Sequence, residues 1–190
     1  MANALTAIRF LLILPVGLLL VSTDSRAALV TAFVLVVAIV TDLLDGPLAR
    51  RMGTATPLGG TFDHTTDFLF VVSGMTGGVM RGVIPGILPV LVVAAFAQYL
   101  LDSYWLHRQH GLRGSSLGRY NGVLYFFPLC GDTMIRLGLT FLSPALALLC
   151  WLLVASTLAS MGQRLIMSVR QLRQRVPVAP SSGISGQSPR

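Results

Sequence analysis

The chain has 190 residues, of which 54% are hydrophobic and only 11% are charged. Soluble domains carry about 25% charged residues, so this composition excludes an ordinary soluble domain and predicts an integral membrane protein. The formal net charge is +7 and all fourteen basic residues are Arg. In so apolar a chain, we expect the basic balance to serve an anionic bilayer surface and not nucleic acid.

Apolar runs predict an all-α integral membrane protein with six transmembrane helices. The segments are 5–22, 27–44, 62–80, 82–106, 118–139 and 143–165. We expect one transmembrane domain over residues 1–170 and a disordered cytoplasmic tail over 171–190, since the final residues are rich in Pro, Ser and Gly. The first segment also has an alternative interpretation as a signal peptide, with Ser25-Arg26-Ala27 as a cleavage-like site.

Arginine placement predicts the orientation. With a cytoplasmic N-terminus, the loops after the second and fourth segments and the C-terminal tail hold most of the Arg residues, whereas the opposite loops hold Arg26 and Arg81, with Arg136 nearby. Cytoplasmic loops are enriched in Arg and Lys, so we expect the inner membrane of the cell as the location. The residues between the second and third segments would then face the cytoplasm.

Four of the seven acidic residues, all of which are Asp, lie in the stretch that joins the second and third segments. Asp42 and Asp45 are three positions apart and Asp63 and Asp67 are four apart, so each pair shares one face of a helix. If the two helices are neighbours, four carboxylates converge, and they need cations to remain ionised together. Oxygen ligands suit Mg²⁺, Mn²⁺ or Ca²⁺ better than zinc or copper. His64 lies between the two Asp residues, and helical pitch predicts that it points elsewhere.

Small and basic residues separate the two acidic pairs. Close backbone approach is permitted by Gly46, Gly53, Gly59 and Gly60, and guanidinium groups for phosphate oxygens are supplied by Arg50 and Arg51. A metal held by carboxylates is a common arrangement for phosphoryl transfer. The plainer alternative is a polar loop whose charges face water.

A second polar region covers residues 103–121, at the predicted cytoplasmic ends of the fourth and fifth segments. Arg108, Arg113 and Arg119 are candidates for binding an anionic acceptor or a lipid phosphate, and ordinary positive-inside charge is the alternative for each. In the fifth segment, Asp132 and Arg136 are four apart, and we expect them to form a structural ion pair within the membrane.

The aspartate stretch resembles the signature of the CDP-alcohol phosphatidyltransferases. That pattern is Asp-x-x-Asp-Gly-x-x-Ala-Arg, eight residues, then Gly-x-x-x-Asp-x-x-x-Asp, and every fixed position is matched over 26 residues. The opening NALTAIRFLLILP resembles the family's Asn-x-Leu-Thr-x-x-Arg segment. The matching positions are Asp42, Asp45, Gly46, Ala49, Arg50, Gly59, Asp63 and Asp67.

The resemblance implies an enzyme, usually a homodimer, that transfers a phosphatidyl group from CDP-diacylglycerol to a small alcohol and releases CMP. Asp42, Asp45, Asp63 and Asp67 would hold Mg²⁺ or Mn²⁺, with two ions expected, and Asp67 would also be the general base. The positions expected to contact the cytidine diphosphate are Gly46, Arg50 and Thr56, with Asn3, Thr6 and Arg9 as further candidates near the cytoplasmic surface. A helix cap and a snorkelling Arg are the alternatives for these last three.

The acceptor alcohol is the open question. The short chain and its opening segment resemble the members that use glycerol-3-phosphate, which we take as the expected acceptor. Those members commonly continue the last motif as Asp-Pro-x-Ala-Asp-Lys, whereas this chain reads DHTTDF. Inositol phosphate is the second candidate, followed by serine or a second phosphatidyl lipid. Two other functional classes are alternatives to this family. One is an aspartate-rich membrane prenyltransferase, and the other is a non-catalytic membrane protein that binds divalent cations.

Overall fold

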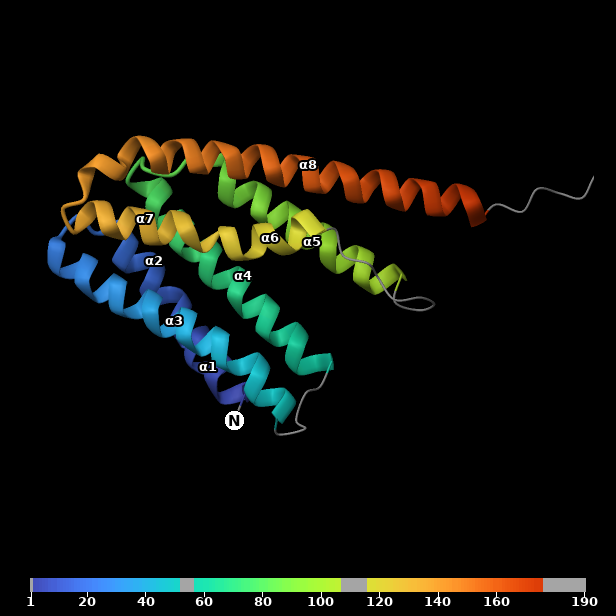
Figure 1. Cartoon of the computed structure of the whole chain (residues 1–190), viewed down its shortest axis with the longest axis horizontal. Coiled ribbons are helices and arrows are strands. Elements are labelled where there is room, and N and C mark those ends of the chain that lie inside the picture. Colours follow the sequence, from blue (N-terminus) through green and yellow to red (C-terminus); the bar gives the residue numbers. More distant parts are fainter. Residues whose placement is uncertain (1, 52–56, 107–115, 176–190) are drawn as a thin grey trace, which may run out of the picture.

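The computed structural model describes residues 2–51, 57–106 and 116–175, and the described part contains helices and no strand (Figure 1). The predicted all-α fold is therefore confirmed. In chain order the helices are α1 Ala2–Leu11, α2 Ile13–Val21, α3 Ser25–Arg51, α4 Pro57–Met80, α5 Ile87–Leu106, α6 Ser116–Leu124, α7 Phe126–Arg136, the 3₁₀ turn η1 Thr140–Leu142 and α8 Ser143–Arg175.

Two of the six predicted segments are each divided into a pair of helices. The breaks fall at Leu12, between α1 and α2, and at Tyr125, between α6 and α7. Pro15 and Pro128 explain both positions, because a proline ring clashes with the carbonyl four residues earlier and lacks an N–H to donate. Those carbonyls belong to Leu11 and Leu124, the last residues of α1 and α6.

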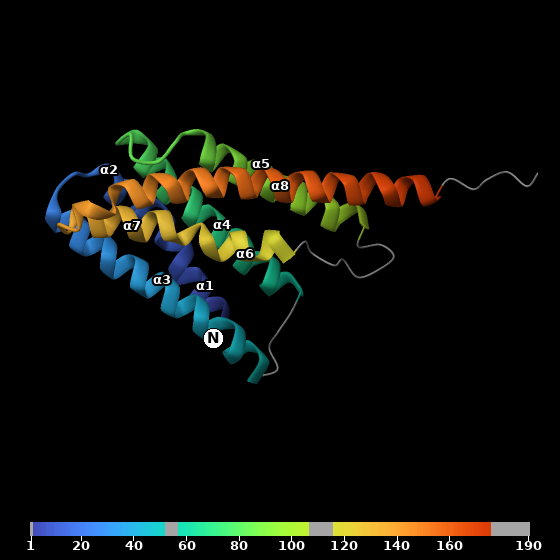
Figure 2. The ribbon, with the colours of Figure 1, turned by 45° about the horizontal axis from the view of Figure 1, so that its top comes forward.

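The surface and the interior have the inverted polarity of a membrane protein. Large apolar side chains such as Phe33 and Leu148 are exposed, whereas Arg9 and Asp132 are buried. Within the described residues, two stretches are long and apolar enough to cross a bilayer, Ser25–Leu44 and Thr140–Met167, and two shorter apolar ones cover Thr6–Val21 and Ile87–Leu101. Helix α8 continues to Arg175, so the first five residues of the predicted tail are helical; in both views its last turns extend beyond the bundle (Figures 1 and 2).

Helices α2 and α4 cross in close contact because both have glycines at the crossing. A Cβ atom on Gly77 would lie 2.5 Å from the carbonyl oxygen of Gly17, and one on Gly17 would lie 2.5 Å from Oγ of Ser73. The Ser73 hydroxyl donates a hydrogen bond of 2.6 Å to the carbonyl of Ile13. Close approach of small residues is a common way to pack membrane helices. This crossing fixes α4 against the α1–α2 segment, and thereby sets α1 beside the polar start of α4.

The predicted ion pair between Asp132 and Arg136 is wrong. Asp132 on α7 binds Arg81, which follows α4, and Arg81 also donates a 2.5 Å hydrogen bond from Nε to the carbonyl of Leu20. Arg136 instead reaches the start of α3, where it donates to the carbonyl of Asp24 at 3.2 Å and to Oγ1 of Thr31 at 3.5 Å. Spacing of four positions allows an ion pair along a helix, but here Asp132 and Arg136 each bind residues from a different part of the chain.

Candidate metal and phosphate site

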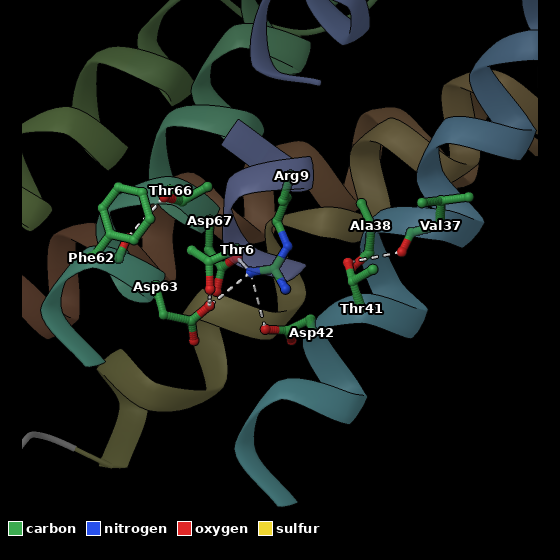
Figure 3. A network of polar contacts seen from close by, with 10 residues as sticks. All are labelled: Thr6, Arg9, Val37, Ala38, Thr41, Asp42, Phe62, Asp63, Thr66 and Asp67. Carbon is green, nitrogen blue, oxygen red and sulfur yellow. Dashed lines mark hydrogen bonds and ion pairs between the residues drawn. The ribbon is translucent and has the colours of Figure 1, made fainter. Parts of the chain in front are cut away.

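Three helices bring charged residues to one point at the end of the bundle where α3 ends and α4 begins (Figure 3). Helix α1 supplies Thr6 and Arg9, α3 supplies Asp42, and α4 supplies Asp63 and Asp67. Nη1 of Arg9 lies 3.1 Å from Oδ1 of Asp63 and 3.4 Å from Oδ1 of Asp42, and it also contacts Oδ1 of Asp67. The predicted convergence of carboxylates from two helices is therefore observed for these three residues.

Burial differs sharply between the cation and the anions. The side chain of Arg9 is 0% exposed, whereas those of Asp42, Asp63 and Asp67 are 42%, 26% and 21% exposed. A buried guanidinium is costly unless it is paired and hydrogen-bonded, and here the carboxylates meet that need. The three carboxylates outnumber the one Arg by two negative charges, so the partly exposed side of the cluster has the charge to bind a divalent cation.

His64 is closer to the site than helical pitch suggested, so the prediction that it points elsewhere is wrong. One ligand atom each from Asp63, His64 and Asp67 lie within 4.8 Å of one another. The physical reason is that His64 and Asp67 are three positions apart, and residues three or four apart are neighbours on the surface of a helix. His64 is exposed, whereas both Asp residues are half-buried.

The threonines around the cluster have two different roles. The hydroxyl of Thr6, which is 4% exposed, donates to Oδ1 of Asp63 at 3.4 Å. Thr41 and Thr66 precede Asp42 and Asp67, but their hydroxyls donate to backbone carbonyls of their own helices, at 2.9 Å and 2.8 Å. Thr6 thus donates to a carboxylate of the cluster, whereas the hydroxyls of Thr41 and Thr66 bond to backbone carbonyls one turn earlier in their own helices (Figure 3).

For several predicted site residues the structure describes the backbone but not the side chain, and others lie outside the described residues altogether. Helix α3 carries the backbone of Asp45, Gly46 and Arg50, and α1 and α6 carry those of Asn3 and Arg119. Thr56, Arg108 and Arg113 fall in the ranges 52–56 and 107–115, which lie outside the described residues. The helices before and after these ranges place the first acidic pair on α3 and the second on α4, as predicted.

Arg9 was expected near the surface, in contact with nucleotide, and the structure instead places it in the interior. The sequence contained a usable signal for this, because Thr6 and Arg9 are three positions apart and face the same way on a mostly apolar helix. A lone Arg on such a face needs an acidic partner, and the four clustered Asp residues are the largest source of carboxylates in the chain.

Comparison with known proteins agrees with this geometry. The sequence model of the CDP-alcohol phosphatidyltransferase family matches residues 1–163. A "Cardiolipin synthase (CMP-forming)" of Streptomyces coelicolor (strain ATCC BAA-471 / A3(2) / M145) is 34% identical over 102 residues, which are 50% of this chain and 46% of that protein. The match thus spans about half the length of the relative. No solved structure matches the chain significantly.

The family match covers most of the chain and includes every described residue of the cluster. The chain belongs to the CDP-alcohol phosphatidyltransferase family, a membrane family of phospholipid biosynthesis.

Proposed function

We propose that this enzyme transfers a phosphatidyl group from CDP-diacylglycerol to glycerol-3-phosphate and releases CMP. The observation that carries the proposal is the convergence of Asp42, Asp63 and Asp67, all positions of the family signature, at one partly exposed point. The chemistry of that point suits a diphosphate substrate, which needs positive charge around its oxygens as one P–O bond breaks.

The described residues fit a divalent cation. Their Oδ1 atoms already surround a single cationic nitrogen, and the donor set is oxygen, which Mg²⁺ and Mn²⁺ prefer. We assign the metal ligands to Asp42, Asp45, Asp63 and Asp67, with two ions as the expected number. When bound, the ions would neutralise charge on the diphosphate and on departing CMP.

A residue of the chain itself can accept the proton that the acceptor hydroxyl loses. We assign Asp67 as the general base: its Oδ1 contacts Arg9, and we give the base role to the second oxygen of its carboxylate. The acceptor hydroxyl gives its proton to Asp67, and its oxygen forms a new bond to the lipid-side phosphorus. The bond between that phosphorus and the oxygen bridging to CMP breaks, and CMP leaves with the electron pair.

Nucleotide and acceptor binding are assigned to the flanking positions. Gly46, Arg50 and Thr56 lie between the two acidic pairs in sequence, and we propose that they bind the cytidine diphosphate, with Asn3 and Thr6 beside them. Because Arg9 is buried against three carboxylates, we assign it to the acidic cluster and not to the nucleotide. The charge of the 107–119 stretch suits an anionic acceptor, which we assign to Arg108, Arg113 and Arg119.

A second acceptor is favoured by one specific observation. The Streptomyces relative is named as a cardiolipin synthase that forms CMP. Cardiolipin carries two phosphatidyl groups on one glycerol, so making it from CDP-diacylglycerol with release of CMP requires phosphatidylglycerol as the acceptor. Phosphatidylglycerol is therefore the second candidate for this chain, and inositol phosphate remains the alternative from the sequence resemblance.

The membrane arrangement proposed for this function has six spans, formed by α1–α2, α3, α4, α5, α6–α7 and α8. Arginine placement supports an inner-membrane enzyme whose acidic cluster faces the cytoplasm, where soluble nucleotides are found. A homodimer and a cytoplasmic tail after α8 complete the proposal.

The test is CMP release by the purified full-length protein from CDP-diacylglycerol with Mg²⁺. Parallel reactions contain glycerol-3-phosphate, phosphatidylglycerol, inositol phosphate, inositol or serine, and a chelator reaction is the metal control. We expect release that depends on Mg²⁺ and on glycerol-3-phosphate. Release that depends on another acceptor would reassign the substrate within the family, and release from a prenyl diphosphate but not from CDP-diacylglycerol would contradict the proposed donor.

A further inference from the structure

Arg9 occupies an unusual position for a charged side chain. It is 0% exposed, yet α1 around it is mostly apolar, and its guanidinium points into the space between α3 and α4 (Figure 3). Moving such a group out of water has a high free-energy cost that only close anionic partners offset. The carboxylates that contact Arg9 therefore indicate the role of its positive charge.

One nitrogen of Arg9 serves three carboxylates. Nη1 carries two hydrogens and donates hydrogen bonds to Asp63 and Asp67 on α4. The 3.4 Å contact with Asp42 on α3 is an ionic contact. Arg9 thus joins the two helices that carry the acidic pairs, which would otherwise bring like charges together.

We propose that Arg9 is a positioning residue that acts as a built-in counter-ion. It holds Asp42, Asp63 and Asp67 in their assembled arrangement before a divalent cation arrives, and its charge weakens the binding of that cation. This inference rests on the proposed metal-dependent function, because it assigns the same carboxylates to both cations.

The proposal makes a linked prediction about stability and metal affinity. Without the charge of Arg9, the metal-free protein contains uncompensated carboxylates, whereas the metal-bound protein does not. Arg9→Gln should therefore destabilise the metal-free state more than the metal-bound state. Because the two effects are linked thermodynamically, the variant should also bind the divalent cation more tightly, on the order of tenfold.

The first measurement is thermal unfolding of the full-length protein in detergent, with a chelator or with saturating Mg²⁺. A thiol-reactive dye can report unfolding because Cys150 is free and 0% exposed in the folded protein. The second measurement is Mn²⁺ affinity by electron paramagnetic resonance, without substrate. We expect Mg²⁺ to raise the melting temperature of Arg9→Gln by more than it raises that of wild type, and we expect tighter Mn²⁺ binding.

Three control variants isolate the charge. Arg9→Lys keeps the charge and should restore a Mg²⁺ response close to that of wild type. Arg81→Gln removes another largely buried Arg, just after the other end of α4 and roughly 25 Å from Asp63 by helix rise, and should lower stability equally with and without Mg²⁺. Arg26 is exposed, so Arg26→Gln should change neither the stability of the protein nor its response to Mg²⁺.

The outcomes separate the proposal from its premise. Equal stability losses of Arg9→Gln in both buffers, with unchanged Mn²⁺ affinity, would overturn the counter-ion role and leave the metal site intact. A wild type that neither binds Mn²⁺ nor responds to Mg²⁺ would overturn the proposed metal-dependent function itself. If Arg9→Gln fails to fold, the double variant with Asp42→Asn decides: charge repulsion predicts recovery of the folded protein, and no recovery overturns the proposal.

Discussion

Arg9 on α1 and Asp67 on α4 are 58 positions apart in sequence and in direct ionic contact in the structure. The contact joins the family's opening segment to the last residue of its signature, and it depends on the glycine-mediated crossing of α2 and α4. The residue proposed as the general base is thus oriented by a neighbour that comes from the start of the chain.

Asp67→Asn tests the base. An amide keeps the size of the side chain and one oxygen near Arg9, but it cannot accept the proton of the acceptor hydroxyl. We expect CMP release to fall by about 10²- to 10⁴-fold, with binding of CDP-diacylglycerol largely retained. Turnover is measured by CMP formation and binding by titration with labelled CDP-diacylglycerol; turnover near the wild-type rate would remove Asp67 from the base role.

The matched control for that experiment is Asp24→Asn. Asp24 is exposed between α2 and α3, where its carboxylate accepts the backbone N–H of Arg26 at 3.1 Å. Activity close to that of wild type is expected there, which would tie the loss in Asp67→Asn to the acidic cluster and not to removal of any carboxylate.

Periodicity and spacing predicted the helices and the acidic site because both depend on local pattern. The pairing of Asp63 and Asp67 follows from four-residue spacing on α4, and helix α1, which packs against both α3 and α4, brings Asp42 to the same point. The partners of Arg9 and Asp132 could not be predicted the same way. Each depends on which helix packs opposite, so Asp132 binds Arg81 across the bundle instead of Arg136 one turn away.

Asp132→Asn tests the ion pair at the opposite end of the bundle. Asp132 is 1% exposed and Arg81 is 10% exposed, so removing the negative charge leaves a mostly buried guanidinium facing neutral acceptors, the Leu20 carbonyl and the amide oxygen of the new side chain. Breaking such a pair costs about 3–5 kcal/mol of unfolding free energy. Thermal unfolding should show a lower melting temperature, and the Mg²⁺ dependence of CMP release by the folded fraction should stay as in wild type. An unchanged melting temperature would mean that the pair contributes no net stability.

Gly77→Ala tests the crossing of α2 and α4. The new methyl group would lie 2.5 Å from the carbonyl oxygen of Gly17, a backbone atom that cannot turn away, so the helices must separate. Overpacking of this kind costs about 1–3 kcal/mol. Gly162→Ala is the control, because a Cβ there meets no atom within 4 Å and alanine favours the helix by up to about 1 kcal/mol. A melting temperature that falls for Gly77→Ala and holds or rises for Gly162→Ala would confirm the close crossing.

His64→Ala tests whether the imidazole belongs to the metal site. His64 lies near Asp63 and Asp67, yet it is exposed, and Mg²⁺ prefers oxygen to nitrogen ligands. We therefore expect the Mg²⁺ concentration for half-maximal CMP release to change by less than about threefold in His64→Ala. The same change at Asp63, Asp63→Ala, should abolish Mg²⁺-dependent release, since it removes a carboxylate that also holds Thr6 and Arg9. Equal losses in the two variants would make His64 a metal ligand in its own right, and would favour a softer ion such as Mn²⁺ over Mg²⁺.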